Sequence, residues 1–240
     1  MTSDKKLFED YFESSFKYGN ILTQEQYEKA SADFERRYGR FLPEDKDAAI
    51  LDIGCGSGHF LYYLDKAGYR NFQGVDLSKE QVEYCRKNIT EKVKLADGME
   101  VLASGEVYDV IVANDLMEHL PKNDVIPFLE KARAALSEEG VFIARVPNMS
   151  NPFSLESRYC DFTHEVGFTE KSLYQVLWVA GFRNIDVLGP AGTPVSSFRN
   201  LVRKCIVSVL HSTIKFFYYV QDFTVPRNLD KVLVAAARKK

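Results

Sequence analysis

The most informative segment of the sequence is Ile50-Leu-Asp-Ile-Gly-Cys-Gly-Ser-Gly-His-Phe60. A short apolar run enters a glycine-rich turn, and an amphipathic stretch that is expected to be helical over 60–67 follows the turn. Glycines let a backbone adopt positive φ and approach a ligand closely. The N-terminus of the following helix offers N–H groups that have no partner within the helix. The stretch therefore predicts a strand, a ligand-binding turn and a helix in that order.

The regions on either side of this stretch predict an α/β fold. Apolar runs that are expected to be strands occur at 49–53, 72–75, 93–96, 108–114, 140–146, 184–188 and 231–237. Amphipathic stretches that are expected to be helices occur at 60–67, 78–88, 123–136 and 169–181. Because parallel strands need crossover connections, this alternation predicts a mostly parallel sheet. We expect a helical cap over residues 1–44, where Thr23 and Gln26 form a capping box, and a main domain over 45–240.

Composition excludes several classes of protein. The chain has 240 residues, 45% of them hydrophobic, which suits a soluble globular domain. Its formal net charge of −3 argues against a DNA partner and against an RNA partner. The first ten residues carry acids and lack the apolar core of a secretory signal, and no apolar stretch is long enough to span a membrane. The four cysteines are widely separated, which is typical of reduced thiols and favours a cytoplasmic location.

The acids around the turn discriminate between two classes of ligand. A dinucleotide-binding turn has a third glycine where this chain has His59, and Asp52 would repel a pyrophosphate. S-adenosylmethionine carries an ammonium and a sulfonium, which a carboxylate attracts. Asp76, at the end of the second expected strand, can accept hydrogen bonds from ribose hydroxyls of either ligand. Asp97 and Met99 could contact an adenine, although Asp97-Gly98 is also typical of a simple turn.

Together these motifs resemble the class I S-adenosylmethionine-dependent methyltransferases. The resemblance rests on the run 51–58, on Gly-Val-Asp at 74–76, on Asp97, and on the segment from Tyr108 to Leu120 that contains Glu118-His119. It implies a Rossmann-like three-layer sandwich with seven strands, the last one antiparallel between the fifth and the sixth. It also implies S-adenosylmethionine as cofactor and S-adenosylhomocysteine as product. We expect the following residues to bind the cofactor: Asp52, Gly54, Cys55, Gly56, Gly58, Asp76, Leu77, Asp97, Gly98, Met99, Asn114 and Asp115.

Two loops at the carboxyl edge of the sheet offer a general base for methyl transfer to a hydroxyl. One is the segment after the fourth strand, which carries His119; this histidine could instead orient the loop or contact the cofactor. The other is the segment 147–165, where His164 is the preferred base and Asp161 is expected to orient it. An alternative is that this second loop only caps the next helix.

The second loop also offers groups that suit a sugar ring. Arg158 provides a fixed cation, while Tyr159 and Phe162 provide aromatic faces, so we expect these three side chains to bind the acceptor.

A metal site is an alternative use of the same edge. Asp115, Glu118, His119 and His164 could converge, and their oxygen and nitrogen atoms suit Mg²⁺, Mn²⁺ or Zn²⁺. The arrangement is similar to the acid-x-x-Glu-His metal motif of small-RNA terminal 2′-O-methyltransferases and of a ubiquinone-pathway O-methyltransferase. Because the first acid is Asp rather than Glu, we expect no divalent metal.

An insertion over 190–228 separates the last two expected strands. No acid occurs from Val187 to Gln221, and apolar residues recur at helical spacing over 196–221. The helix could be a lid or a dimer helix that buries its apolar face. Alternatively, it could be a membrane-interface helix that rests on anionic lipid or on a lipid-linked substrate.

The insertion and the Asp-Phe-Thr-His loop resemble methyltransferases of surface-polysaccharide pathways, such as those for O-antigen and capsule. This resemblance implies O-methylation of a sugar or related small molecule, with a small-molecule or glycan acceptor as partner. If the helix over 196–221 is a membrane-interface helix, the enzyme is cytoplasmic and peripheral on the inner face of the membrane. The alternatives are a metal-dependent RNA 2′-O-methyltransferase, a quinone-type O-methyltransferase and a non-catalytic cofactor-binding scaffold.

Overall fold

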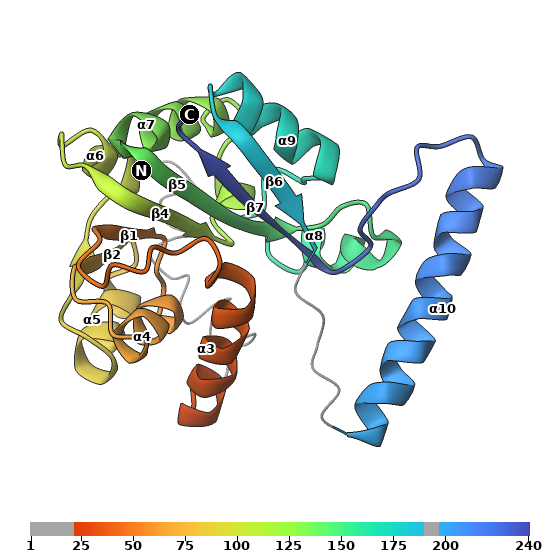
Figure 1. The fold of residues 1–240 in the computed structure, drawn as a ribbon, viewed down its shortest axis with the longest axis horizontal. Coiled ribbons are helices and arrows are strands. Elements are labelled where there is room, and N and C mark those ends of the chain that lie inside the picture. The colour runs from red at the N-terminus through yellow and green to blue at the C-terminus, as the bar shows by residue number, and fades with distance from the viewer. Residues whose placement is uncertain (1–21, 190–196) are drawn as a thin grey trace.

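The computed structural model describes residues 22–189 and 197–240, and its centre is a twisted sheet (Figure 1). In the described residues the sheet has seven strands in the order β3-β2-β1-β4-β5-β7-β6. The strands are β1 Ile50–Ile53, β2 Phe72–Asp76, β3 Val93–Leu95, β4 Tyr108–Asn114, β5 Leu136–Pro147, β6 Arg183–Leu188 and β7 Val232–Arg238. β7 pairs antiparallel with both β5 and β6, and the remaining pairs are parallel. The predicted fold class is therefore confirmed, including the position of the last strand.

Helices cover both faces of the sheet, which gives three layers (Figure 1). One face is covered by α3 Gln24–Tyr38, α4 His59–Lys66 and α5 Lys79–Asn88. The other is covered by α6 Gly98–Leu102, α7 Val125–Ala135 and α9 Glu170–Val179. The loops after β4 and β5 contain η2 Met117–His119, η3 Pro152–Ser154 and α8 Leu155–Tyr159. These short elements and α6 have no helical periodicity long enough to be predicted from sequence.

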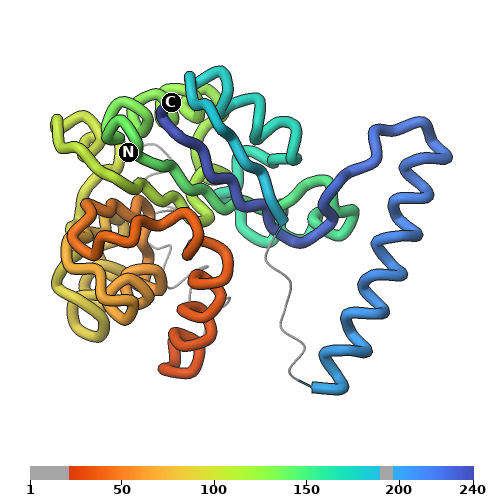
Figure 2. The backbone as a smooth tube through the Cα atoms, in the orientation of Figure 1, coloured from red at the N-terminus to blue at the C-terminus, as the bar shows by residue number. Residues whose placement is uncertain are grey.

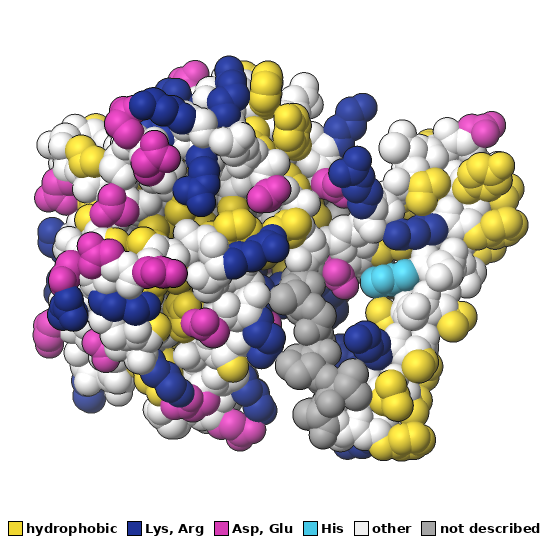
Figure 3. Space-filling model, in the orientation of Figure 1, with side chains coloured by type: hydrophobic (Ala, Val, Ile, Leu, Met, Phe, Trp, Pro, Cys, Tyr) yellow, Lys and Arg dark blue, Asp and Glu magenta, His cyan; other side chains and the backbone are white. Residues whose placement is uncertain are grey.

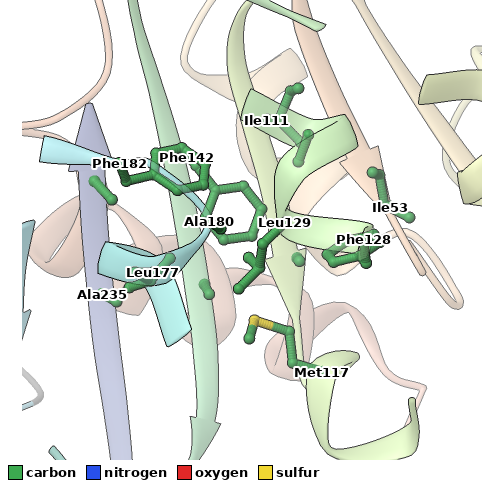
Figure 4. Close-up of a cluster of buried hydrophobic side chains, with 14 of the residues drawn as sticks. Ile53, Ile111, Met117, Phe128, Leu129, Phe142, Leu177, Ala180, Phe182 and Ala235 are labelled. Atoms are coloured by element: carbon green, nitrogen blue, oxygen red, sulfur yellow. The ribbon is translucent and has the colours of Figure 1, made fainter. Parts of the chain in front are cut away.

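Alternation along the central strands divides the core between the two faces. In β4, Val110 and Val112 pack toward α3 and α4, whereas Ile111 and Ala113 pack toward α7 and α9. Figure 4 shows the second cluster, in which Phe142 of β5 lies among aliphatic and aromatic side chains from the covering helices. A strand that is buried on both faces is continuously apolar, which explains why the central strands were predictable.

The start of β5 differs from the prediction. The strand was expected at 140 and begins at Leu136, which pairs with Tyr108. The register then shifts before Val141 pairs with Val110. Because the intervening residues are polar and lie at a sheet irregularity, they carry no alternating pattern.

Helix α3 is the described part of the cap that was expected over 1–44, and residues 1–21 lie outside the described residues. Thr23 caps it by accepting a hydrogen bond from the backbone N–H of Gln26. Tyr27, Phe34 and Tyr38 form its buried face, which packs on α4. The cap is thus part of the same core as the sheet.

The helix expected within 196–221 is α10 Phe198–Val220, and it packs on neither face of the sheet. Figure 2 shows it standing beside the α/β body. None of its residues is buried. Across 22–189 and 197–240, no helix is both long and apolar enough to cross a bilayer.

Candidate functional site

A cavity of about 850 Å³ lies at the carboxyl ends of β1, β2 and β4. Its wall includes α3, which the sequence analysis did not assign to the site. The predicted site residues that line it are Asp52, Gly54, Cys55, Gly56, Asp76, Leu77, Asp97, Gly98, Met99, Asn114, Asp115, His119 and His164. Within the described part of the chain, Gly58, Arg158, Tyr159, Asp161 and Phe162 are not among the lining residues.

The glycine-rich turn after β1 requires glycine by conformation. Gly54, Gly56 and Gly58 have φ values of 70°, 54° and 83°, in the region that side chains disfavour. A Cβ on Gly58 would lie 2.5 Å from the sulfur of Cys85. Gly58 therefore starts α4 against α5, whereas Gly54 and Gly56 shape the cavity wall.

Asp52 puts a buried carboxylate under this turn. The residue is 1% exposed, and its Oδ1 has no hydrogen-bond partner among the described residues. Burial raises the pKa of Asp52 well above its ordinary value, and the nearby charge of Asp76 raises it further. A cation brought into the cavity would relieve both effects, which fits the ammonium or sulfonium of S-adenosylmethionine.

Backbone hydrogen bonds fix the orientation of the Asp76 carboxylate. Its Oδ2 accepts the backbone N–H of Gly56, and its Oδ1 accepts that of Ser78, both at 2.8 Å. Burial raises the pKa of Asp76, and these hydrogen bonds oppose that rise. The carboxylate also lines the cavity, where it could accept hydrogen bonds from ribose hydroxyls.

Asp97 has a local structural role, as the Asp97-Gly98 turn pattern indicated. Its Oδ1 accepts the backbone N–H of Met99 at 2.7 Å and caps α6. Both residues also line the cavity, so a capping role and a role in holding an adenine are compatible at this position.

Arg145 of β5 is a site residue that the sequence analysis missed. Its guanidinium forms an ion pair with Asp115, with Nε 3.0 Å from Oδ1. Asp115 has a φ of 49° and donates its backbone N–H to the carbonyl of Arg145 at 2.9 Å. A lone arginine in the otherwise apolar run 140–146 was the available signal. Next to Asp115, Asn114 accepts a hydrogen bond from the hydroxyl of Tyr38, which ties α3 to the end of β4.

The two histidines meet across the loops, as expected. Their rings are edge to face with centroids 4.6 Å apart. Nδ1 of His164 lies 2.7 Å from the carbonyl oxygen of Ser157. A carbonyl can only accept, so Nδ1 carries the hydrogen and Nε2 of neutral His164 carries the lone pair.

Asp161 is connected to the other histidine, which corrects the expectation that it orients His164. Its Oδ1 accepts the hydroxyl of Thr163 at 2.6 Å, and the same hydroxyl oxygen lies 2.7 Å from Nδ1 of His119. Because the Thr163 proton is directed to the carboxylate, Nδ1 of His119 is the donor to Thr163. Burial lowers the pKa of His119 to about 4, so its imidazole is neutral at pH 7.

Glu118 lies beside this pair in an unusual environment. It is 2% exposed, and neither carboxylate oxygen has a hydrogen-bond partner among the described residues. Burial, followed by the charge of Asp115, raises the pKa of Glu118 well above its ordinary value. Glu118, His119 and His164 offer ligand atoms that all lie within 4.8 Å of one another. The fourth expected ligand, Asp115, is engaged by Arg145 instead.

The three residues expected to bind the acceptor lie on the outside of the second loop. Arg158 donates to the backbone carbonyls of His164 and Glu165, the latter at 3.1 Å, and so fixes the loop. Tyr159 and Phe162 are 74% and 88% exposed. Acceptor binding by these side chains stays a prediction.

Comparisons with known proteins agree with this geometry. Residues 24–187 match a family described as Methyltransferase domain. A ubiquinone biosynthesis O-methyltransferase of Actinobacillus pleuropneumoniae is 28% identical over 102 residues, which are 38% of this chain and 42% of the relative. A malonyl-[acyl-carrier protein] O-methyltransferase of Halalkalibacterium halodurans is 35% identical over 91 residues, or 33% of this chain and 32% of the relative.

The fold as a whole is also found among solved structures. A SAM-dependent methyltransferase from Archaeoglobus fulgidus superposes with a TM-score of 0.66 at 21% identity. The superposition covers 97% of this chain and 98% of the other. The chain thus shares its whole fold with that protein, whereas it spans less than half the length of the two O-methyltransferases that it matches in sequence.

Proposed function

The chain belongs to the methyltransferase-domain family, and from that premise we propose that it is an S-adenosylmethionine-dependent O-methyltransferase. One observation carries the proposal. A single cavity holds a buried carboxylate, Asp52, at the glycine-rich turn and a pair of imidazoles, His119 and His164, at the neighbouring loops. The first end suits a cationic donor, and the second suits a hydroxyl that must lose a proton.

The donor end binds by charge and by hydrogen bonds. Asp52 would attract the positive charge of the donor, Asp76 would accept hydrogen bonds from its ribose hydroxyls, and Asp97 and Met99 would hold its adenine. S-adenosylmethionine supplies, when bound, a methyl group on a positively charged sulfur. Because such a leaving group is already good, the chain contributes mainly position and exclusion of water.

At the acceptor end, Nε2 of His164 takes the proton of the acceptor hydroxyl. The acceptor oxygen would thereby become the nucleophile for the methyl group that bound S-adenosylmethionine would supply. The carbonyl of Ser157 fixes the imidazole so that Nε2 carries the lone pair. His119, held by Thr163, packs edge to face against His164 and limits its rotation.

The acceptor belongs, in this proposal, to the small hydroxyl compounds, and a sugar of a surface glycan is the favoured one. Support comes from the two O-methyltransferases among the relatives. The exposed aromatic side chains of the second loop lie outside the cavity and would bind only the distal part of such an acceptor. A quinol-type acceptor is the alternative that those relatives suggest.

The test is transfer of a labelled methyl group to a panel of nucleotide sugars, glycan fragments, a catechol and a short RNA. His164→Asn keeps a donor toward the Ser157 carbonyl and removes the base, so kcat should fall by about 10²–10⁴ with unchanged cofactor binding. His211→Asn, on α10, is the matched control and should behave as wild type. Normal turnover by the His164 variant, or no transfer to any hydroxyl compound, contradicts the proposal.

A metal-dependent version of the same reaction is the second candidate, because the carboxylate of Glu118 is buried without a partner among the described residues. Glu118, His119 and His164 would hold a divalent cation, which would lower the pKa of an acceptor hydroxyl. Activity that chelator abolishes and Mg²⁺, Mn²⁺ or Zn²⁺ restores favours this candidate. Activity that chelator leaves unchanged favours His164 as base.

A further inference from the structure

Helix α10 presents a long apolar stripe that nothing in the described structure covers. Its 23 residues extend about 34 Å at 1.5 Å per residue. The exposed apolar residues Phe198, Val202, Ile206, Val209, Phe216 and Val220 recur at intervals that place them on one face. Figure 3 shows apolar side chains along the outer edge of this helix, away from the α/β body. The stripe therefore faces outward.

The opposite face of α10 explains how the helix is held. The Tyr218 hydroxyl donates to the carbonyl of Ser150 at 3.0 Å, and Lys215 donates to the carbonyl of Arg227 at 2.9 Å. Pro152, Ile214 and Phe217 line a shallow apolar hollow at the same place. The Tyr218 and Pro152 contacts attach the C-terminal half of α10 to the loop that also carries Ser157 and His164, and the Lys215 contact attaches it to the segment that follows the helix.

Two arginines flank the outward stripe. With 3.6 residues per turn, Arg199 and Arg203 fall beside it, whereas Lys204 and Lys215 lie toward the face that holds the helix. No acid occurs from Val187 to Gln221. The helix thus combines an apolar stripe with four cations in a chain whose net charge is −3.

The charges of α10 discriminate between two candidates for covering the stripe, a second copy of the helix and an anionic bilayer. A second copy of α10 would bring the same four cations and no acid from this segment to offset them, so the charges would repel. An anionic bilayer supplies both phosphate groups and hydrocarbon. Phe216, Phe217 and Tyr219 at the C-terminal end are 55–71% exposed, and aromatic side chains favour the membrane–water interface.

We propose that α10 docks this protein on an anionic lipid bilayer, where it lies in the interface with its outward stripe in the acyl boundary. The attached loop follows it to the membrane surface. That loop exposes Phe153, Leu155, Tyr159 and Phe162. The mouth of the cavity would then take acceptors that are themselves held at the membrane.

The experiment is flotation of the full chain with vesicles of phosphatidylcholine alone or mixed with phosphatidylglycerol. We expect binding to the mixed vesicles only, and a loss of binding at high salt. Ser208→Glu and Ile206→Glu each add one negative charge to an exposed position of α10. One added negative charge should weaken vesicle binding about fivefold, which is the loss expected for the Ser208 variant. The Ile206 variant also loses an apolar side chain of the stripe, so its binding should be at least about tenfold weaker than that of the Ser208 variant.

Neither substituted position is buried, so the circular dichroism spectrum and the cofactor binding of both variants should match those of wild type. The proposal is overturned if wild type ignores both kinds of vesicle, if it binds both equally, or if both variants bind alike. It is also overturned if gel filtration shows a dimer that Ile206→Glu dissociates while vesicles remain unbound. Because flotation needs no methyl transfer, its outcome is independent of the proposed activity.

Discussion

Replacement of Asp52 by Asn should stabilise the ligand-free protein and weaken donor binding. The carboxylate is buried, and its Oδ1 lacks a partner among the described residues. Leaving a buried polar group unsatisfied costs about 1–3 kcal/mol, and more when the group is charged. Asn removes the charge and the repulsion from Asp76 at nearly constant volume. We therefore expect the free energy of unfolding at pH 7 to rise by about 1–3 kcal/mol, or about 2–4 °C in Tm per kcal/mol.

The pH dependence of stability independently predicts that D52N is more stable than wild type. Burial raises the pKa of Asp52 in the folded protein above its unfolded value. Between those two values the folded state holds a proton that the unfolded state lacks, so stability falls as pH rises. The contribution is about 1.4 kcal/mol per pH unit. D52N should lack this contribution, and the stability difference between variant and wild type should grow from pH 4 upward.

The assay is urea unfolding across pH with and without S-adenosylmethionine. Ligand at about 100 times its Kd stabilises wild type by about 2.7 kcal/mol, and D52N should gain much less. Asp65→Asn, on the exposed side of α4, is the matched control and should change neither quantity. A D52N protein that is less stable than wild type without ligand, or that gains as much from the ligand, refutes the reasoning.

Two other perturbations test the turn and the histidine pair. Gly58→Ala should destabilise by at least twice the loss in Gly68→Ala, because both positions have positive φ but only a Cβ at Gly58 meets a buried sulfur. Strain alone is worth about 1–2 kcal/mol, and equal losses in urea unfolding would contradict the packing reason. Thr163→Val should lower kcat about 10-fold or more with unchanged KM for the donor, because His119 loses its acceptor. Thr163→Ser should restore kcat, and a Val variant with normal kcat would exclude a positioning role.

The sequence was sufficient for the sheet because its strands are buried on both faces. Continuous apolar runs such as Ile111 to Ala113 have few alternative placements, and the glycine-rich turn fixes where the first crossover begins. The carboxyl edge follows from parallel pairing, so the convergence of Asp52, Asp76 and His119 on one cavity could be predicted.

Contacts between side chains of distant segments could not be predicted in the same way. Asp161 reaches His119 through Thr163 because η2 and the second loop lie against each other, where Glu165 and Val166 both donate to the carbonyl of Glu118. No local pattern encodes that approach. Similarly, nothing near Asp115 in sequence indicates that a strand residue 30 positions later neutralises it.

The charges of the cavity also bear on turnover. Arg145 forms its ion pair with Asp115 and lowers the pKa of Asp52 only from a distance, and within residues 22–189 and 197–240 no ion pair is made by Asp52 or Asp76. Methyl transfer would remove the positive charge from sulfur, and the product would keep the ammonium and the carboxylate that the donor also carries. The attraction that holds the donor is therefore weaker for the product, while the hydrogen bonds to ribose and adenine are the same. A site built on unmatched buried carboxylates thus distinguishes donor from product by charge and favours exchange of one for the other after each turnover.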